Sequence, residues 1–223
     1  MNLINKVFIF SVMAVFFCLV IWCSAGDEIL NNSTPVIPIL ESASVESQVD
    51  YLNGSISLVS GWNFVSVPRR LADDSNKASI FSEINSSGHS IWTYNLNDGG
   101  WNDLLPDDKV LPMEGYWVYS SAPILVPVSF SNDPLQVPPV KDLVAGWNMF
   151  GFTGNTPASA RDSLLSIKSL WTEVIGWDEG KQQFDTTIIN DGSNEHADSA
   201  LLNPYHSYWL FVNESCSLAS IGA

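Results

Sequence analysis

Cysteine is scarce in this sequence. Only three cysteines occur in 223 residues, and two of them, Cys18 and Cys23, belong to the first 25 residues. If that segment is removed, Cys216 remains alone and no internal disulfide can form. The protein is therefore not a small secreted scaffold held by disulfides, and its fold must depend on a hydrophobic core, which a chain of this length can build.

Basic residues are also few. The chain has 9 Lys and Arg against 24 Asp and Glu, which gives a formal net charge of −15. Binding of nucleic acid needs clustered positive charge, so this composition argues against nucleic acid as a partner. The acidic residues are spread along the chain and not gathered in a tail, which indicates a solvated surface.

The motifs of catalysis are missing as well. Three histidines occur, and there is no Gly-x-Ser-x-Gly elbow, no His-Glu-x-x-His and no glycine-rich phosphate loop. The adjacent carboxylates Asp73-Asp74 and Asp107-Asp108 would point in different directions along a strand, whereas glycoside hydrolysis needs two acids that face each other. We predict that the protein is not an enzyme and uses no cofactor; a secreted hydrolase is a minor alternative.

What the sequence does have begins with an apolar N-terminus. Lys6 precedes an uncharged run from Val7 to Trp22, and Cys23-Ser24-Ala25-Gly26 then supplies small residues suited to cleavage. This order is typical of a secretory signal peptide over residues 1–25, which predicts an extracellular or cell-surface protein. The alternative is an uncleaved anchor, since the run is close to the shortest that spans a bilayer. Contact with a membrane would then be made only through this segment.

The next segment, residues 26–55, is rich in Ser, Asn, Pro and Glu and has no sustained period, so we interpret it as a flexible tether. Acceptor patterns for N-glycosylation occur in it and beyond it. They are Asn31, Asn32, Asn53, Asn85 and Asn213. Several such patterns in an exported chain lead us to expect a glycoprotein.

An internal repeat dominates the rest of the chain. Leu58-Val59-Ser60-Gly61-Trp62-Asn63 recurs 85 residues later as Leu143-Val144-Ala145-Gly146-Trp147-Asn148. Each copy continues with a short helix-like patch and an aromatic strand, and each ends in a Tyr-Trp strand, Tyr116-Trp117 in the first and Tyr208-Trp209 in the second. Because the order and spacing of four landmarks agree, we predict two copies of one module.

Local patterns indicate the elements of each module. Short aromatic and β-branched segments such as Phe64–Val67 indicate strands that are covered on both faces. Residues 95–100 are expected to form the turn of a hairpin, and they resemble a calcium loop only superficially. Residues 157–170 are expected to be helical, with Thr156 as the cap.

The predicted fold class is mainly β, with two homologous small sandwich-like or barrel-like modules, each with one short helix, after the signal peptide and the tether. We place the first module at residues 56–132, a Pro-rich linker at residues 133–140 and the second module at residues 141–223. The sequence leaves open whether the modules form two bodies or a single pseudo-twofold body.

The Gly-Trp-Asn opening, the central Ile-Trp-x-Tyr hairpin and the Gly-Tyr-Trp-Val-Tyr ending resemble the repeats of exported archaeal cell-surface proteins of the methanogen type. The resemblance covers residues 56–130 well. Residues 141–220 diverge from it: Ser207 replaces a glycine, and Phe150-Gly151 replaces Val-Ser. The resemblance implies an envelope location and a structural or binding role, and it implies no catalytic residue.

Aromatic residues are abundant, and nine of them are tryptophans. The four that recur as landmarks of the repeat are expected in the core: Trp62, Trp117, Trp147 and Trp209. Trp101 and Trp177 flank the hairpin turns, so they are our candidates for exposed, ligand-binding residues that could stack on sugar rings.

Residues 189–201 form an insertion found only in the second copy. It holds Asp191, Glu195, His196 and Asp198, a set that could ligate a hard cation. A polar surface loop would have the same composition, and we favour the loop.

These observations predict a non-catalytic secreted or cell-surface module with a structural or adhesive role in the cell envelope. Envelope glycans or other surface proteins are the expected partners. The alternative is a carbohydrate-binding module that uses the aromatic residues of the hairpin tips.

Overall fold

The structure is a computed structural model that describes residues 52–72, 75–98, 100–133 and 137–220. The predicted signal peptide, most of the predicted tether, Asn31 and Asn32 lie outside these residues. The described residues belong to one compact unit. They are mainly β, as the sequence predicts.

Copy 1 runs from the first described strand to the sixth. Its elements are β1 (Asn53–Leu58), β2 (Gly61–Val65), α3 (Lys77–Ile80), β3 (Trp92–Asn95), the 3-10 turn η1 (Leu96–Asp98), β4 (Gly100–Asp103), β5 (Tyr116–Ser120) and β6 (Ile124–Ser129).

Copy 2 repeats this order and adds short strands. Its elements are β7 (Val140–Leu143), β8 (Gly146–Gly151), β9 (Ala158–Ser159), α4 (Ala160–Ser163), η2 (Leu165–Ile167), β10 (Trp171–Ile175), β11 (Trp177–Asp178), β12 (Gln183–Phe184), β13 (Ile188–Ile189), η3 (Asn194–His196), β14 (Leu201–Leu202), β15 (Ser207–Val212) and β16 (Cys216–Ala219).

The two copies have the same sheet topology. Copy 1 has a four-stranded sheet of order β2-β5-β3-β4 and a two-stranded ribbon β1-β6, and copy 2 has β8-β15-β10-β13 and β7-β16. The register also repeats, since Trp62 pairs with Tyr119 as Trp147 pairs with Phe211. The predicted duplication is therefore visible in the hydrogen-bonded pairing of the strands.

Each copy is a two-layer sandwich with its own core. In copy 1, Ile56 and Val126 of the ribbon pack against Val65 and Val118 of the sheet. In copy 2, a second core lies between its ribbon and its sheet. The sheets are open, so the barrel-like form that the sequence also allowed is not adopted.

The helices are shorter than expected in copy 2. The predicted helix over residues 157–170 is limited to α4 and the turn η2. The reason is that Ala158 and Ser159 pair with β14, so Ser159 rather than Thr156 is the cap, and its side chain accepts a hydrogen bond from the Asp162 N–H at 3.1 Å. In copy 1, Asn76 caps α3 in the same way, accepting from the Ser79 N–H at 2.8 Å.

The copies exchange main-chain hydrogen bonds in a reciprocal manner. The Ser66 N–H donates to the Tyr205 carbonyl and the Gly151 N–H donates to the Met113 carbonyl, each at 2.9 Å. Ser66 and Gly151 are equivalent in the repeat, and so are Met113 and Tyr205, which both have a positive φ (63° and 65°). The contact is thus made twice, as it would be across the axis of a symmetric dimer.

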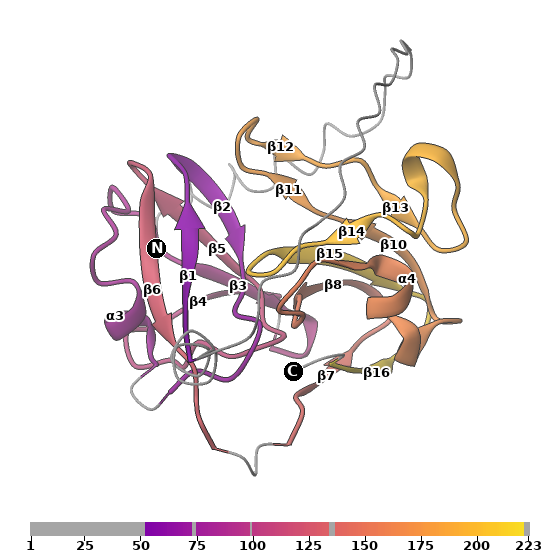
Figure 1. Ribbon diagram of the computed structural model, residues 1–223, viewed down its shortest axis with the longest axis horizontal. Coiled ribbons are helices and arrows are strands. Elements are labelled where there is room, and N and C mark those ends of the chain that lie inside the picture. The colour runs from indigo at the N-terminus through magenta and orange to yellow at the C-terminus, as the bar shows by residue number, and fades with distance from the viewer. Residues whose placement is uncertain (1–51, 73–74, 99, 134–136, 221–223) are drawn as a thin grey trace, which may run out of the picture. The chain divides into compact units, whose positions relative to one another are not determined.

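Side chains are exchanged as well. Met113 of copy 1 is 3% exposed and belongs to the core of copy 2, while Tyr205 of copy 2 packs against the core of copy 1. Figure 1 shows the two copies side by side, with β3 of copy 1 next to β8 of copy 2. The alternative left open by the sequence is therefore resolved in favour of one pseudo-twofold body.

Candidate functional site

A layer of aromatic side chains lies between the two copies. Successive residues of a strand point to opposite faces, so Phe64 and Trp117 share the face of the copy 1 sheet that turns away from its own ribbon. Their rings stack at 4.4 Å with an interplanar angle of 7°. Phe64 also approaches Trp209 of copy 2, with the ring centroids 6.1 Å apart. Both faces of this sheet are thus covered, as the apolar pattern predicts.

Each hairpin holds the closing-strand tryptophan of the other copy. Tyr94 and Trp101, paired across β3 and β4, approach Trp209 edge-on at 5.1 and 5.7 Å. In copy 2, Trp177 and its cross-strand partner Phe184 approach Trp117 edge-on at 5.0 and 6.3 Å. Edge-to-face pairs at these distances stabilise by about 0.5–1.5 kcal/mol each beyond the area they bury.

The expectation that Trp177 is exposed is wrong. Its side chain is 6% exposed, and its indole N–H donates to the Trp62 carbonyl at 3.0 Å. The hairpin that carries it folds back over copy 1 instead of projecting into solvent. Trp101 is half-buried against Trp209. The two candidate ligand-binding residues are therefore parts of the interface between the copies.

The landmark tryptophans separate into two kinds. Trp117 and Trp209 are 9% and 4% exposed, as predicted for core residues. Trp62 and Trp147 are half-buried, so these two lie at the margin of the core in which the sequence places all four. They sit one pair from the end of the β2–β5 and β8–β15 ladders, where the opposite copy covers them incompletely.

Three half-buried rings of copy 1 form a cluster at this end. His89 stacks on Tyr119 at 4.3 Å with an interplanar angle of 27°, and Trp62 meets Tyr119 edge-on at 5.4 Å. Copy 2 has the Trp147–Phe211 pair at the equivalent place, also edge-on, at 5.3 Å. Sequence analysis did not single out His89, because it lies in a connection and not in a repeated landmark.

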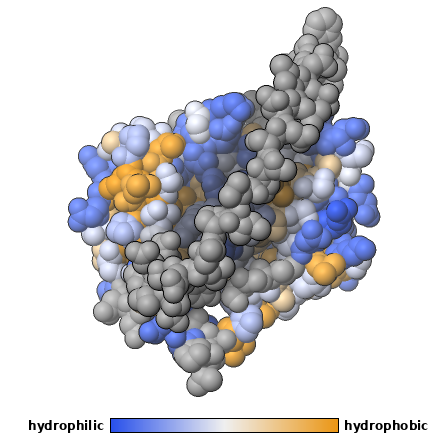
Figure 2. Space-filling model, viewed as in Figure 1, coloured by the Kyte–Doolittle hydropathy of each residue, from blue (hydrophilic) through white to orange (hydrophobic). Residues whose placement is uncertain are grey.

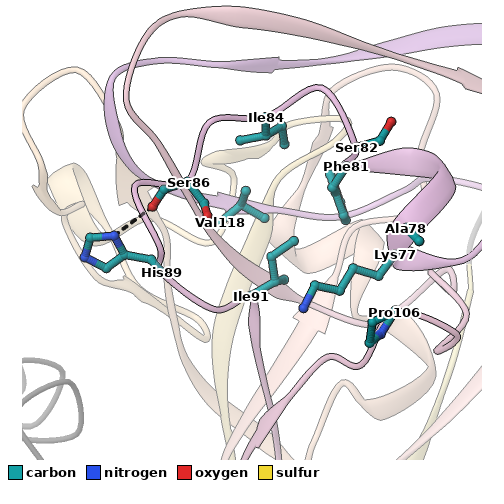
Figure 3. Close-up of a pocket in the computed structure, with 10 residues that line it drawn as sticks. All are labelled: Lys77, Ala78, Phe81, Ser82, Ile84, Ser86, His89, Ile91, Pro106 and Val118. Carbon is teal, nitrogen blue, oxygen red and sulfur yellow. Dashed lines mark hydrogen bonds between the residues drawn. The ribbon is translucent and has the colours of Figure 1, made fainter. Parts of the chain in front are cut away.

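A pocket of about 180 Å³ opens beside this cluster (Figure 3). Its walls come from α3, the connection to β3, the connection after β4, and β5, and they are mostly apolar. The lining residues are Lys77, Ala78, Phe81, Ser82, Ile84, Ser86, His89, Ile91, Pro106 and Val118. His89 forms the rim nearest the cluster, and its Nδ1 lies 2.8 Å from the Ser86 carbonyl oxygen.

Two of the four candidate cation ligands of the insertion are engaged in other contacts, and the other two are exposed. Asp198 is buried and pairs with Arg161 at 3.5 Å, and His196 Nδ1 lies 2.7 Å from the Thr187 carbonyl oxygen. Asp191 and Glu195 are exposed. Across the part of the chain that the structure describes, no three His, Cys, Asp or Glu side chains gather in a group that could hold a metal ion.

The carboxylate pairs are placed on the surface where they can be described. Asp108 is exposed, and its carboxylate accepts a hydrogen bond from the Leu105 N–H at 2.7 Å, which closes a turn. Asp107 is also exposed. Asp73 and Asp74 lie outside the described residues.

The candidate glycosylation sites that the structure describes are accessible. Asn53, Asn85 and Asn213 are all exposed. Asn53 lies in β1, three residues before the start that the sequence suggested for the first module.

Comparison with known proteins adds no relative. No protein-family model matches the chain, and no curated protein or solved structure is significantly similar to it. The resemblance to archaeal cell-surface repeats therefore stays a prediction. Within the described residues, no helix has the length and apolar character needed to cross a bilayer.

Proposed function

We propose that this protein is a non-catalytic secreted or cell-surface module with a structural or adhesive role in the cell envelope. The observation that supports this most directly is the use made of its aromatic residues. Trp117, Trp177 and Trp209 are buried in the layer between the copies, where they join the two sandwiches. Side chains that could have formed a binding platform instead stabilise the body.

The surface is consistent with this role. The chain carries a net charge of −15, and Figure 2 shows a largely hydrophilic face with a hydrophobic patch over copy 1. Leu125 of β6 is 66% exposed. A strongly charged surface keeps a protein soluble outside the cell. The partners that fit the proposal are envelope glycans and other surface proteins, with membrane contact only through the N-terminal segment.

The proposal is tested by locating the protein and measuring what it does there. Cells producing the full chain are fractionated, with a variant that lacks residues 1–25 as the control. We expect the full chain in the envelope or medium, with Gly26 as its first residue by mass spectrometry, and the control in the cytoplasm. The exported protein should sediment with isolated envelopes and release no sugar or peptide from them.

Two outcomes would contradict the proposal. One is cytoplasmic residence of the full chain with residues 1–25 intact. The other is hydrolysis of an envelope polymer that is lost when a single carboxylate is replaced by its amide.

A carbohydrate-binding role is the second candidate, and one observation favours it. The rings of Trp62, His89 and Tyr119 are only half-buried, and flat rings suit the apolar face of a sugar. If this role holds, Tyr119→Ala abolishes binding on a glycan array, whereas Phe211→Ala, the equivalent change in copy 2, leaves it intact. Equal binding by both variants would remove the cluster from consideration.

A further inference from the structure

The pocket of copy 1 has a counterpart in copy 2. Phe81 and Leu164 both end their short helix, with φ, ψ of −107°, 17° and −105°, 19°. Their N–H groups donate to the first helical carbonyl, that of Lys77 at 3.0 Å and that of Ala160 at 2.9 Å. The two residues are therefore structural equivalents.

The other apolar walls correspond in the same way. Ile84 and Ile167 each lie three residues further on and donate to the carbonyl of Phe81 or Leu164, at 3.3 and 3.0 Å. Strand register supplies the last two pairs. Trp92 pairs with Trp117 in copy 1, and Ile175 pairs with Trp209 at the equivalent place in copy 2. The pocket residues next to Trp92 and Trp117 therefore have equivalents next to Ile175 and Trp209. The matches are Ile91 with Val174 and Val118 with Leu210.

In copy 2 an indole ring is buried in the same core cluster as these walls. Trp171 is 1% exposed and belongs to the same core cluster as the four matching wall residues. Trp171 lies four residues after Ile167 and three before Val174, and the same spacing from Ile84 and Ile91 gives Gly88 in copy 1. Gly88 is exposed and has a φ of 80°, and a Cβ on it would have no atom within 4 Å, so copy 1 has no side chain at this position. Copy 1 therefore keeps the walls and lacks the ring.

The charged groups at the rim already have partners. The ammonium group of Lys77 donates to the Leu104 carbonyl and lies 3.7 Å from the Asp103 carboxylate. His89 is held by the Ser86 carbonyl and by Tyr119. A ligand in this pocket therefore meets apolar walls and no unpaired charge, which favours an uncharged molecule.

We propose that the pocket of copy 1 is a binding site for a small, uncharged, planar aromatic molecule, which occupies the space that Trp171 fills in copy 2. The size agrees, since an apolar cavity of about 150 Å³ suffices to hold a benzene ring. This site is separate from the proposed structural role, and its presence does not depend on that role.

The test is a titration of the exported protein with 5-fluoroindole, followed by ¹⁹F NMR of the ligand and methyl NMR of the protein. We expect saturable binding with a Kd of about 0.1–1 mM, a normal value for a ligand of this size. The methyl signals of Ile84, Ile91 and Val118 should shift, while those of the copy 2 equivalents Ile167 and Val174 should not.

Matched variants locate the site. Ala78 lines the pocket and is exposed, so Ala78→Trp should cover it and weaken binding at least tenfold. Ser79→Trp places the same side chain on the next residue of α3, which does not line the pocket, and should change the Kd less than twofold. Absence of saturable binding, or equal Kd values for the two variants, would overturn the proposal.

A further titration distinguishes a free small molecule from a tryptophan side chain of a partner protein as the occupant of the pocket. N-acetyl-tryptophanamide carries the same indole as a protein side chain would, and its backbone groups add to the volume that the pocket must accommodate. We expect it to bind at least tenfold more weakly than 5-fluoroindole. If N-acetyl-tryptophanamide binds as tightly as 5-fluoroindole, the occupant is a partner's side chain and not a small molecule, and the assignment is overturned.

Discussion

Asn63 and Asn148 explain why the opening motif of each copy contains asparagine. The side-chain oxygen of Asn63 accepts from the Val59 N–H at 2.8 Å, and its amide donates to the carbonyls of Val59 and Gly61, both at 3.0 Å. Asn148 makes the same three bonds around Gly146. Gly61 and Gly146 have φ values of 109° and 107°. A residue with a side chain would be strained in this backbone conformation. The motif is thus a turn closed by its own asparagine, although the sequence indicates only that it recurs.

The residues at which the copies diverge lie where the copies touch. A Cβ on Gly151 would lie 2.5 Å from the Ser66 Cβ, and a Cβ on Gly115 would lie 2.4 Å from Met149. Ser66 and Gly151 are equivalents that face each other across the pseudo-axis, so only one of them can carry a side chain. The divergence that weakens the repeat in the sequence is therefore required by packing.

Gly151→Ala should destabilise the protein by about 1–3 kcal/mol, because the added methyl meets Ser66 and the Glu114 carbonyl oxygen with no room to move. The measurement is the free energy of unfolding by urea. Gly180→Ala is the control: this glycine is exposed, and its nearest atom would be the Asp178 Oδ1 at 3.3 Å. We expect the control to change stability by less than about 0.5 kcal/mol. Equal effects would contradict the packing argument.

At the scale of the element, the strands were predictable and their partners were not. Alternating apolar faces identify β2, β5, β3 and β10, and the coverage of both faces follows from the same pattern. The pattern does not specify which sheet covers the second face. The hairpin β11–β12 was expected to end in solvent, but Trp177 and Phe184 give it an apolar side that packs on Trp117. The helix over residues 157–170 was predicted too long because the β9–β14 pair is too short to detect.

Burial of Trp177 predicts a large effect of its removal. Trp177→Ala should cost about 3–5 kcal/mol, the range for a buried aromatic side chain, and should also remove the hydrogen bond to the Trp62 carbonyl. Trp147→Ala serves as the comparison, because this ring is half-buried and makes one aromatic contact, with Phe211, among the described residues. Thermal or urea unfolding should show the smaller loss for Trp147→Ala. The reverse order would mean that the β11–β12 hairpin does not pack on copy 1.

The closing strands predict how stability depends on alkaline pH. Burial raises the pKa values of the Tyr116 and Tyr208 hydroxyls above their ordinary value of about 10. Each hydroxyl accepts a backbone N–H bond, from Leu111 at 2.9 Å and from Asn203 at 2.7 Å. The folded state therefore holds these protons more tightly than the unfolded state does. Their contribution is fully present below about pH 10 and is lost as the pH rises further, by about 1.4 kcal/mol per pH unit for each tyrosine.

The measurement is the free energy of unfolding by urea between pH 7 and pH 11.5. Tyr116→Phe with Tyr208→Phe should lower stability at pH 7, since two N–H groups lose their acceptor, at about 1–3 kcal/mol each. The same double variant should show a shallower alkaline decline than the wild type. An unchanged alkaline slope would mean that these hydroxyls do not control the decline.

At the scale of the whole molecule, the sequence predicts two modules, whereas the structure makes them interdependent. Met113 completes the core of copy 2, and Tyr205 packs on the core of copy 1. Sequence reasoning could not foresee this exchange, because a duplicated pattern is the same whether copies are separate or interlocked. The residues that decide it, such as Met113 and Tyr205, occupy equivalent positions but differ in chemistry, so no repeat marks them.

Interlocking predicts that neither half folds alone. A fragment of residues 26–136 would lack Tyr205 and the covering hairpin β11–β12, and it would expose Phe64 and Trp117. We expect this fragment and the complementary fragment, residues 137–223, each to lack a cooperative unfolding transition. Mixed in equal amounts, they should restore a transition and form a one-to-one complex, as measured by near-ultraviolet circular dichroism and analytical ultracentrifugation.

Self-association of one half provides the sharper control. A homodimer of copy 1 would have to pair as copy 1 pairs with copy 2, and Ser66 would then face a second Ser66 instead of Gly151. There is no room for this second side chain, because a Cβ built on Gly151 would lie only 2.5 Å from the Ser66 Cβ. We therefore expect copy 1 alone to form no stable homodimer, and Ser66→Gly, which removes the clash, to increase its self-association. Independent cooperative folding of either half as a monomer would contradict the interlocked body, because each core would then be complete without the residue donated by the other copy.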